Sequence, residues 1–253
     1  MGATLPPLSI MGSLRWDIAR RLLPTGRGLD VLEVGCGQGA VGVRLAADHQ
    51  YLGLEPDHSS FETARSRLTT LGRGEVRCGS TDLVEPGRQF DLIVSFEVIE
   101  HIEDDASALT SWVRMLRPGG SLVLSTPGYQ ARYGPMDAAV GHFRRYEPAV
   151  LVALMERAGL EAVEVRHYGM PIGYWVEAVR NVVARRRERS EGEITMEEGT
   201  GRSGRFLQPA GRAAGLAIGV ATVPFRFVQR AFPERGPTLL ARGERPTRDA
   251  GLR

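Results

Sequence analysis

Three ionisable side chains, those of Glu97, Glu100 and His101, follow directly on an apolar segment in "FDLIVSFEVIEH". A carboxylate among apolar residues costs free energy unless it is paired or binds a cation. Positions i, i+3 and i+4 of a helical turn share one face, so the three side chains can converge. Two carboxylates and an imidazole suit a divalent cation, and His142 in "GHFRRYEP" is a candidate fourth ligand.

The same residues also allow chemistry without a metal ion. Glu97 can contact a cofactor instead, while His101 or His142 can act as a general base toward a substrate hydroxyl. A purely structural role for the cluster is the third alternative. The sequence leaves these alternatives open, and His101 and His142 are the candidate bases in either active case.

The elements that could position these residues alternate between strand and helix patterns from about Leu14 to Gly169. Short apolar segments predict strands at residues 29–35, 51–57, 75–83, 90–97, 121–127 and 160–169. Helical spacing predicts helices at residues 14–23, 40–48, 59–71, 105–116 and 147–159, with a turn at 117–120. Apolar strands that alternate with helices indicate an α/β fold with a mostly parallel sheet covered on both faces.

The segment after Gly169 breaks this alternation. It carries a predicted helix at residues 174–189 and a polar glycine-rich loop at 190–204. A second helical stretch runs up to 232, and a last strand follows at 236–244. We interpret the chain, 1–253, as a single domain and 170–235 as a helical insertion within it. We expect this insertion to act as a lid over the substrate pocket or as an oligomer contact.

An apolar stripe lies in the second helical stretch, residues 213–232, and consists of Leu216, Val220, Val223 and Phe227. These residues recur at helical spacing, which favours packing against the protein core. Arginines lie beside them, so peripheral contact with a membrane, for a lipid-like substrate, is the alternative. The apolar run is too short to span a bilayer.

Three segments at predicted strand ends suit a nucleotide-like ligand. The glycines of "LEVGCGQGAVG" let the backbone approach a ligand and expose amide groups at a helix start. Glu55 ends the second strand and can accept hydrogen bonds from two ribose hydroxyls, which also fits a nicotinamide cofactor. Asp82 follows the third strand and can accept from an adenine amine, with Leu83 against the base.

Together these segments resemble the class I S-adenosylmethionine-dependent methyltransferases. The resemblance rests on "LEVGCGQG", "GLEPD", "STDL", "FEVIEHI" and "LRPGGSLVLSTP", in this order. It implies a Rossmann-like, seven-stranded, mostly parallel sheet with an antiparallel last strand. It also implies S-adenosylmethionine as cofactor, S-adenosylhomocysteine as product, and Glu97 beside the sulfonium. The implied cofactor-binding residues are Glu33, Gly35, Gly37, Gly39, Glu55, Pro56, Thr81, Asp82, Leu83 and Phe96.

The carboxylate–histidine pattern is similar to that of two groups in this family, the ubiquinone-biosynthesis O-methyltransferases and the plant small-RNA 2′-O-methyltransferases. In those groups it binds a divalent metal that polarises the acceptor hydroxyl. The resemblance implies Mg²⁺ or another divalent cation on Glu97, Glu100, His101 and His142. We expect O-methylation of a small molecule, such as a specialised metabolite or a quinone-like or sugar-like hydroxyl, with His101, His142 and Glu97 as catalytic residues.

Composition limits the alternatives. The formal net charge is +2, so nucleic acid is an unfavoured partner and RNA 2′-O-methylation ranks below small-molecule O-methylation. All 32 basic residues are Arg, which excludes a Schiff-base lysine and a phosphate-loop lysine. N-methylation of a small molecule, an NAD-dependent dehydrogenase and a non-catalytic cofactor-binding scaffold are the remaining alternatives.

The cellular setting is predicted from two further observations. Cys36 and Cys78 are far apart and form no disulfide framework, which fits a reducing cytosol. The first residues show no basic segment followed by an apolar core, so we expect no signal peptide and a cytoplasmic protein. The oligomeric state stays open.

Overall fold

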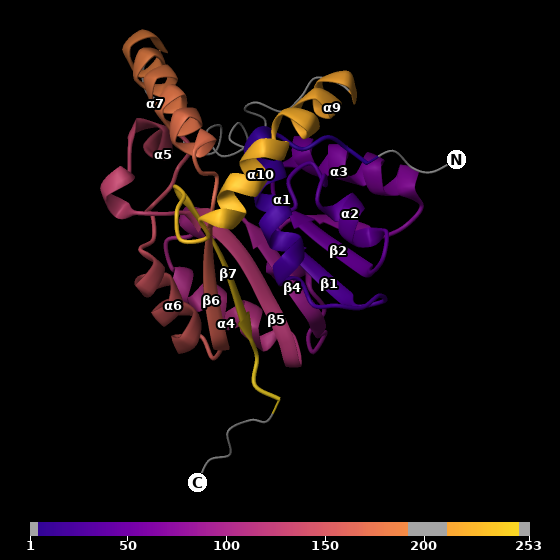
Figure 1. Ribbon diagram of the computed structural model, residues 1–253. Coiled ribbons are helices and arrows are strands. Elements are labelled where there is room, and N and C mark those ends of the chain that lie inside the picture. The colour runs from indigo at the N-terminus through magenta and orange to yellow at the C-terminus, as the bar shows by residue number, and fades with distance from the viewer. Residues whose placement is uncertain (1–4, 192–211, 248–253) are drawn as a thin grey trace.

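A seven-stranded sheet forms the centre of the computed structural model, which describes residues 5–191 and 212–247 (Figure 1). The strand order is β3-β2-β1-β4-β5-β7-β6. β7 runs antiparallel to β5 and β6, and the other neighbouring strands are parallel. The predicted Rossmann-like sheet with an antiparallel last strand is therefore confirmed.

The elements follow the predicted alternation. The strands are β1 (Asp30–Val34), β2 (Gln50–Glu55), β3 (Glu75–Cys78), β4 (Phe90–Phe96), β5 (Leu116–Pro127), β6 (Glu161–Tyr168) and β7 (Thr238–Glu244). The helices are α1 (Ile10–Leu22), α2 (Gly42–Ala46), α3 (His58–Leu71), α4 (Asp105–Arg114), α5 (Pro135–Ala139), α6 (Pro148–Arg157), α7 (Ile172–Glu191), α9 (Arg212–Ala221) and α10 (Val223–Ala231). Short 3₁₀ helices are η1 (Thr81–Leu83), η2 (Ile99–His101) and η3 (Gln130–Arg132).

Two apolar cores lie on the two faces of the sheet. Val31 and Leu32 are neighbours on β1, both fully buried, and belong to opposite cores because successive strand side chains alternate between faces. The core around Leu32 includes Trp112 of α4, whereas the core around Val31 includes Leu14 of α1. Burial on both faces explains why the strands are continuous apolar runs.

The turn predicted at 117–120 is wrong, because these residues belong to β5. The register of β5 against β4 shifts between Phe90 and Leu92, which accommodates the extra residues. A Cβ atom at Gly120 would lie 2.9 Å from the carbonyl oxygen of Arg117, so glycine is required at this irregularity. The strand therefore begins before the glycine pair rather than after it.

Three helices, α7, α9 and α10, stand between β6 and β7 in the described part of the chain. α7 extends outward next to α5, and the asparagine Asn181 of α7 accepts a hydrogen bond from the amide of Met136 at 3.1 Å (Figure 1). α10 contacts α1, where Asp17 accepts hydrogen bonds from Arg230 and Gln229. Residues 190 and 191 are helical in α7, and the rest of the loop predicted at 190–204 lies outside the described residues.

The apolar stripe of α9 and α10 does not pack as expected. Leu216, Val220 and Phe227 have 72%, 65% and 63% of their surface exposed, while Phe225 packs against the core around Val31. The expected packing of the stripe against the core is therefore wrong. Within the described residues, no helix combines the length and the apolar character needed to cross a membrane.

Candidate active site

β4 ends at Phe96, and the next residue, Glu97, has a left-handed backbone conformation with φ 59°. This conformation costs a non-glycine residue on the order of 1–3 kcal/mol, so surrounding contacts must hold it. Glu97 Oε1 accepts hydrogen bonds from Ser125 Oγ at 2.7 Å and from the Tyr168 hydroxyl at 3.0 Å. Arg15 of α1 lies 3.8 Å from the same oxygen. Distant segments therefore fix this carboxylate at the strand exit.

Glu100 lies on η2 and is fully buried, with 0% of its surface exposed. Its Oε2 accepts a hydrogen bond from Thr126 Oγ1 at 3.0 Å, whereas its Oε1 has no hydrogen-bond partner among the described residues. Burial raises the pKa of Glu100 well above its ordinary value, and the nearby charge of Glu97 adds to the effect. A buried carboxyl oxygen without a partner is a position that a cation would stabilise.

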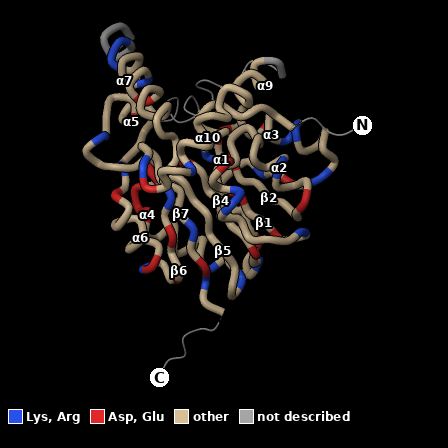
Figure 2. The backbone as a smooth tube through the Cα atoms, in the orientation of Figure 1, with Lys and Arg blue, Asp and Glu red and all other residues tan. Residues whose placement is uncertain are grey.

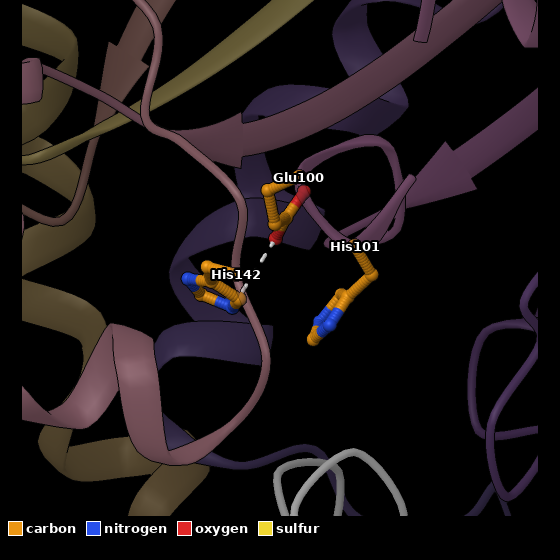
Figure 3. Close-up of side chains that lie close together, drawn as sticks. All are labelled: Glu100, His101 and His142. Carbon is orange, nitrogen blue, oxygen red and sulfur yellow. Dashed lines mark ion pairs between the residues drawn. The ribbon is translucent and has the colours of Figure 1, made fainter. Parts of the chain in front are cut away.

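His101 and His142 complete a group with Glu100 in which the candidate ligand atoms lie within 4.8 Å of one another (Figure 3). His142 Nε2 is 3.9 Å from Glu100 Oε1, and the two imidazole rings meet edge to face with centroids 4.6 Å apart. The amide of Phe143 donates to the Glu100 carbonyl at 2.8 Å, which joins the His142 segment to η2. Burial and the neighbouring His142 lower the pKa of His101 to about 4.

The structure brings together three of the four predicted metal ligands. Glu97 stays outside the group, because its Oε1 is engaged by Ser125 and Tyr168. Donor atoms bound to one cation at about 2.1 Å are at most about 4.2 Å apart, twice that bond length. The group spans up to 4.8 Å, so its side chains must draw together to hold an ion. The donor set, a carboxylate and two imidazoles, fits a divalent transition metal or Mg²⁺ with water ligands.

The glycine loop between β1 and α2 has a backbone that requires glycine. Gly35, Gly37 and Gly39 have φ of 73°, 54° and 72°. A Cβ atom at Gly35 would lie 2.4 Å from Val98 Cγ2, while one at Gly37 would meet nothing within 4 Å. The loop thus leaves open space beside Gly37, where the backbone can approach a ligand closely.

Glu55 joins the end of β2 to this loop. Its Oε2 accepts from the Gly37 amide at 2.7 Å and its Oε1 from the Asp57 amide at 2.9 Å. Burial raises the pKa of Glu55, although the two amide hydrogen bonds act in the opposite direction. Each carboxylate oxygen can accept a second hydrogen bond, so Glu55 retains capacity for ribose hydroxyls. Pro56, another predicted cofactor-binding residue, follows Glu55 directly in the sequence.

The predicted adenine-binding residues Thr81, Asp82 and Leu83 form η1 after β3. Leu83 has 43% of its surface exposed, which leaves an apolar surface that a base could cover. The Asp82 carboxylate accepts from Ser80 Oγ at 2.9 Å. The carboxylate, glycine loop and exposed leucine together fit the ribose, amino acid and adenine parts of S-adenosylmethionine.

Glu33 and Phe96 are buried beneath the glycine loop rather than open to solvent. Glu33 Oε2 accepts from the Tyr51 hydroxyl at 2.6 Å, and burial raises the pKa of Glu33 to about 8. Phe96 is 7% exposed, and the Arg15 guanidinium lies 4.9 Å from its ring centroid. Direct cofactor contact by Glu33 and Phe96 stays a prediction.

Sequence reasoning missed several residues at this site. Arg15 lies on the first helix, and the packing of α1 beside β5, β6 and β7 brings it to Glu97. Ser125 and Thr126 stand within the quoted motif "LRPGGSLVLSTP", yet their partners become visible only from the pairing of β4 with β5. Polar residues at the end of an otherwise apolar strand are the signal that could have identified them.

A sheet of this order, with a glycine turn after β1, an acidic residue after β2 and polar residues after β4, defines a class I methyltransferase. The sequence matches the family described as Methyltransferase domain over residues 12–165, more than half of the chain. The chain therefore belongs to this methyltransferase family.

Two named relatives illustrate the similarity. A probable S-adenosylmethionine-dependent methyltransferase of Mycolicibacterium smegmatis is 36% identical over 149 residues, covering 57% of this chain and 56% of that protein. A ubiquinone biosynthesis O-methyltransferase of Dinoroseobacter shibae is 30% identical over 189 residues, covering 62% of this chain and 75% of that protein. The chain thus spans about half the length of the M. smegmatis protein, and it spans 40–52% of the length of other curated relatives.

Solved structures share the fold at low sequence identity. Phosphoethanolamine N-methyltransferase 2 of Haemonchus contortus, in complex with S-adenosyl-L-methionine, superimposes with a TM-score of 0.58 at 16% identity, covering 97% of this chain and 54% of that one. The cyclase SpnF gives a TM-score of 0.61 at 17% identity, covering 92% of this chain and 80% of that one. Since one of these proteins is named a cyclase, such similarity shows the fold alone.

Proposed function

We propose that the protein transfers a methyl group to a hydroxyl of a small molecule, with Glu100, His101 and His142 holding a divalent cation beside the acceptor. The observation that carries the proposal is the buried Glu100 Oε1, which has no hydrogen-bond partner among the described residues and faces His142 at 3.9 Å. Names of relatives support the oxygen acceptor, because several are ubiquinone biosynthesis O-methyltransferases.

In the proposed reaction, the residues of this chain have the following roles. Bound S-adenosylmethionine supplies a methyl group on a sulfonium sulfur, and the cation, when present, lowers the pKa of a nearby hydroxyl. The glycine loop and Glu55 hold the donor, and the cluster holds the acceptor, so the two are oriented for in-line transfer. A carbon–oxygen bond forms, the carbon–sulfur bond breaks, and the hydroxyl proton leaves to solvent or to an imidazole.

A metal-free mechanism with a histidine base is the second candidate. His142 favours it, because its Nε2 lies at the centre of the cluster. His101 does not, because an imidazole whose pKa lies near 4 is a weak base at neutral pH. The neutral imidazole is, in contrast, the form that binds metals. The unpartnered, buried Glu100 Oε1 beside these imidazoles therefore supports the cation better than a His101 base.

Chelation and metal titration test the proposal. The protein is freed of metal with EDTA and assayed with labelled S-adenosylmethionine and a panel of catechols, phenols and sugars, before and after addition of Mg²⁺, Mn²⁺ or Co²⁺. We expect transfer to an oxygen acceptor that is lost on chelation and restored by a metal. Transfer that continues unchanged in EDTA would remove the cation from the mechanism. Transfer to amines alone would overturn the oxygen acceptor.

RNA methylation is less well supported. The formal net charge is +2, and in the described part of the chain basic and acidic residues are interspersed along the backbone (Figure 2). A strong phosphate-binding surface would require clustered basic charge. Transfer to tRNA or small RNA in the same assay would reverse this ranking.

We also propose that the α9–α10 stripe contacts an anionic membrane surface, as a site of access for a lipid-like acceptor. Its residues Leu216, Val220 and Phe227 are exposed, and residues 212–232 contain three arginines and no acidic residue. An apolar face beside cations suits the interface of an anionic bilayer.

Vesicle sedimentation tests this contact. We expect the full chain to sediment with phosphatidylglycerol vesicles more than with phosphatidylcholine vesicles, and L216S/F227S to lose this difference. V179S, on the exposed surface of α7, is the control for a general loss of apolar surface. Equal sedimentation of wild type and L216S/F227S, or oligomerisation through the stripe, would contradict the membrane contact.

A further inference from the structure

Asp137 of α5 lies next to the proposed centre but supplies no atom to it. Its carboxylate is buried, with 2% of its surface exposed, and its Oδ1 lies 2.8 Å from His142 Nδ1. Arg145 binds both oxygens, with Nε 2.9 Å from Oδ1 and Nη2 2.7 Å from Oδ2. The amide of Gly134 donates to Oδ2 at 2.8 Å. Both carboxylate oxygens therefore accept hydrogen bonds from the Arg145 guanidinium, and Oδ2 also accepts one from the amide at the start of α5.

This arrangement determines which nitrogen of His142 carries the proton. A carboxylate held by a bidentate guanidinium is an acceptor at both oxygens. The short contact from Oδ1 to His142 Nδ1 is therefore a hydrogen bond in which Nδ1–H donates. In a neutral imidazole the other nitrogen, Nε2, then keeps its lone pair. That nitrogen is the one that lies 3.9 Å from Glu100 Oε1.

We propose that Asp137 is a positioning residue that fixes the Nδ1–H tautomer of His142 and directs the Nε2 lone pair into the centre. The inference rests on the proposed role of His142. Carboxylates commonly act in this way on histidine ligands and bases, because the hydrogen bond sets both the tautomer and the ring orientation.

The same network ties His142 to α7, between β6 and β7. Arg145 Nη1 lies 3.2 Å from Glu177 of α7, and Arg132 lies 3.1 Å from the other oxygen of Glu177. Glu177 is thus linked to Asp137 through Arg145 but does not contact His142. A substitution at Glu177 disturbs the network one step further away and is a matched control for a substitution at Asp137.

Nitrogen-15 NMR of the histidine rings reads the tautomer directly. The whole chain is labelled on its 5 histidines, and the His142 signals are assigned as those lost in His142→Gln. We expect Nδ1–H in the wild type and in Glu177→Gln. In Asp137→Asn the amide NH₂ can donate to Nδ1, so we expect the Nε2–H tautomer. Asp137→Glu keeps a carboxylate and should restore Nδ1–H.

Two results would overturn the inference. One is the Nε2–H tautomer in the wild-type protein, which needs no variant to fold. The other is an unchanged Nδ1–H tautomer in a folded Asp137→Asn variant, with folding checked by binding of S-adenosylhomocysteine in a calorimeter. A purely structural role for Asp137 predicts this second result.

Cobalt binding separates this inference from the proposed function. If Co²⁺ binds the wild type, we expect Asp137→Asn to weaken it by about 10–100-fold and Glu177→Gln to leave it unchanged. Equal Co²⁺ affinity in Asp137→Asn and wild type would contradict the positioning role. If Co²⁺ does not bind the wild type at all, the metal centre fails, and the tautomer still decides the role of Asp137.

Discussion

The two halves of the sheet hold their functional residues by different means. In the half formed by β1, β2 and β3, partners at most 18 residues away in the sequence hold them, as when the amides of Gly37 and Asp57 donate to Glu55 and the Tyr51 hydroxyl donates to Glu33. In the half formed by β4, β5 and β6, side chains far apart in the sequence do so, as when Tyr168 donates to Glu97. The donor side is therefore a property of local sequence, and the acceptor side is a property of the tertiary fold.

Glu100→Gln tests the acceptor half and carries the largest expected effect. The amide removes the charge but keeps the volume and the contact with Thr126. We expect methyl transfer to fall by about 10²–10⁴-fold, because both a cation and a proton acceptor depend on that carboxylate. Affinity for S-adenosylhomocysteine, measured by calorimetry, should stay at the wild-type value. A matching loss of cofactor affinity would show that the two halves are not separable.

Gly35→Ala tests the donor half. A Cβ atom there would lie 2.4 Å from Val98 Cγ2, on a backbone with φ 73°. Strain and overpacking together should lower the free energy of unfolding by about 2–4 kcal/mol and abolish cofactor binding. The control is Gly219→Ala in α9, where nothing lies within 4 Å of the added carbon. Urea unfolding measures both, and an equal effect in the two variants would contradict the steric argument.

Sequence alone placed the candidate cofactor-binding residues at the strand ends where the structure has them. The glycine loop, Glu55 and Asp82 lie at strand ends that hydrophobic pattern identifies, and short-range geometry fixes what they can contact. In the acceptor half, Glu97, Glu100, His101 and His142 were predicted together. The structure groups the last three, whereas Glu97, whose left-handed backbone is not visible in a sequence, lies outside the group. Arg15, Tyr168 and Asp137 were missed, since their partners are set by packing of helices and β6 on distant strands.

Acid unfolding sharpens the comparison within the acceptor half. Burial opposes ionisation of Asp137, but hydrogen bonds from His142 and Arg145 outweigh it and lower its pKa from 3.8 to about 2. Because folding lowers its pKa, the ionised Asp137 carboxylate stabilises the fold at pH values above its ordinary pKa. This stabilisation is lost as pH falls from about 4 toward 2. We expect Asp137→Asn to cost at most about 2 kcal/mol at pH 7, and the difference from wild type to shrink below pH 4.

Urea unfolding at pH 7, 5, 4 and 3 measures this effect. Glu177→Gln is the control, because the Glu177 side chain forms ion pairs with Arg145 and Arg132, whereas Asp137 is paired with Arg145 and His142. We expect a smaller change there. A difference between wild type and Asp137→Asn that stays constant down to pH 3 would mean that the Asp137 charge does not stabilise the fold.

The smallest effect concerns the backbone at Glu97. Glu97→Ala and Glu97→Gly both remove the carboxylate, but only glycine adopts φ 59° without strain. We expect the glycine variant to be the more stable of the two by about 1 kcal/mol, by urea unfolding, and both to lose methyl transfer. Equal stability of the two variants would show that the left-handed conformation carries no cost here.

The left-handed conformation of Glu97 also bears on how such an enzyme loses its activity in evolution. Glutamate and glycine codons differ by one nucleotide, so Glu97→Gly is a single mutational step. It relieves the backbone, and water can replace the carboxylate because that side chain is 35% exposed. The resulting chain would fold and bind the methyl donor without using it. At this position we therefore expect a single inactivating mutation to give a folded protein that still binds the cofactor.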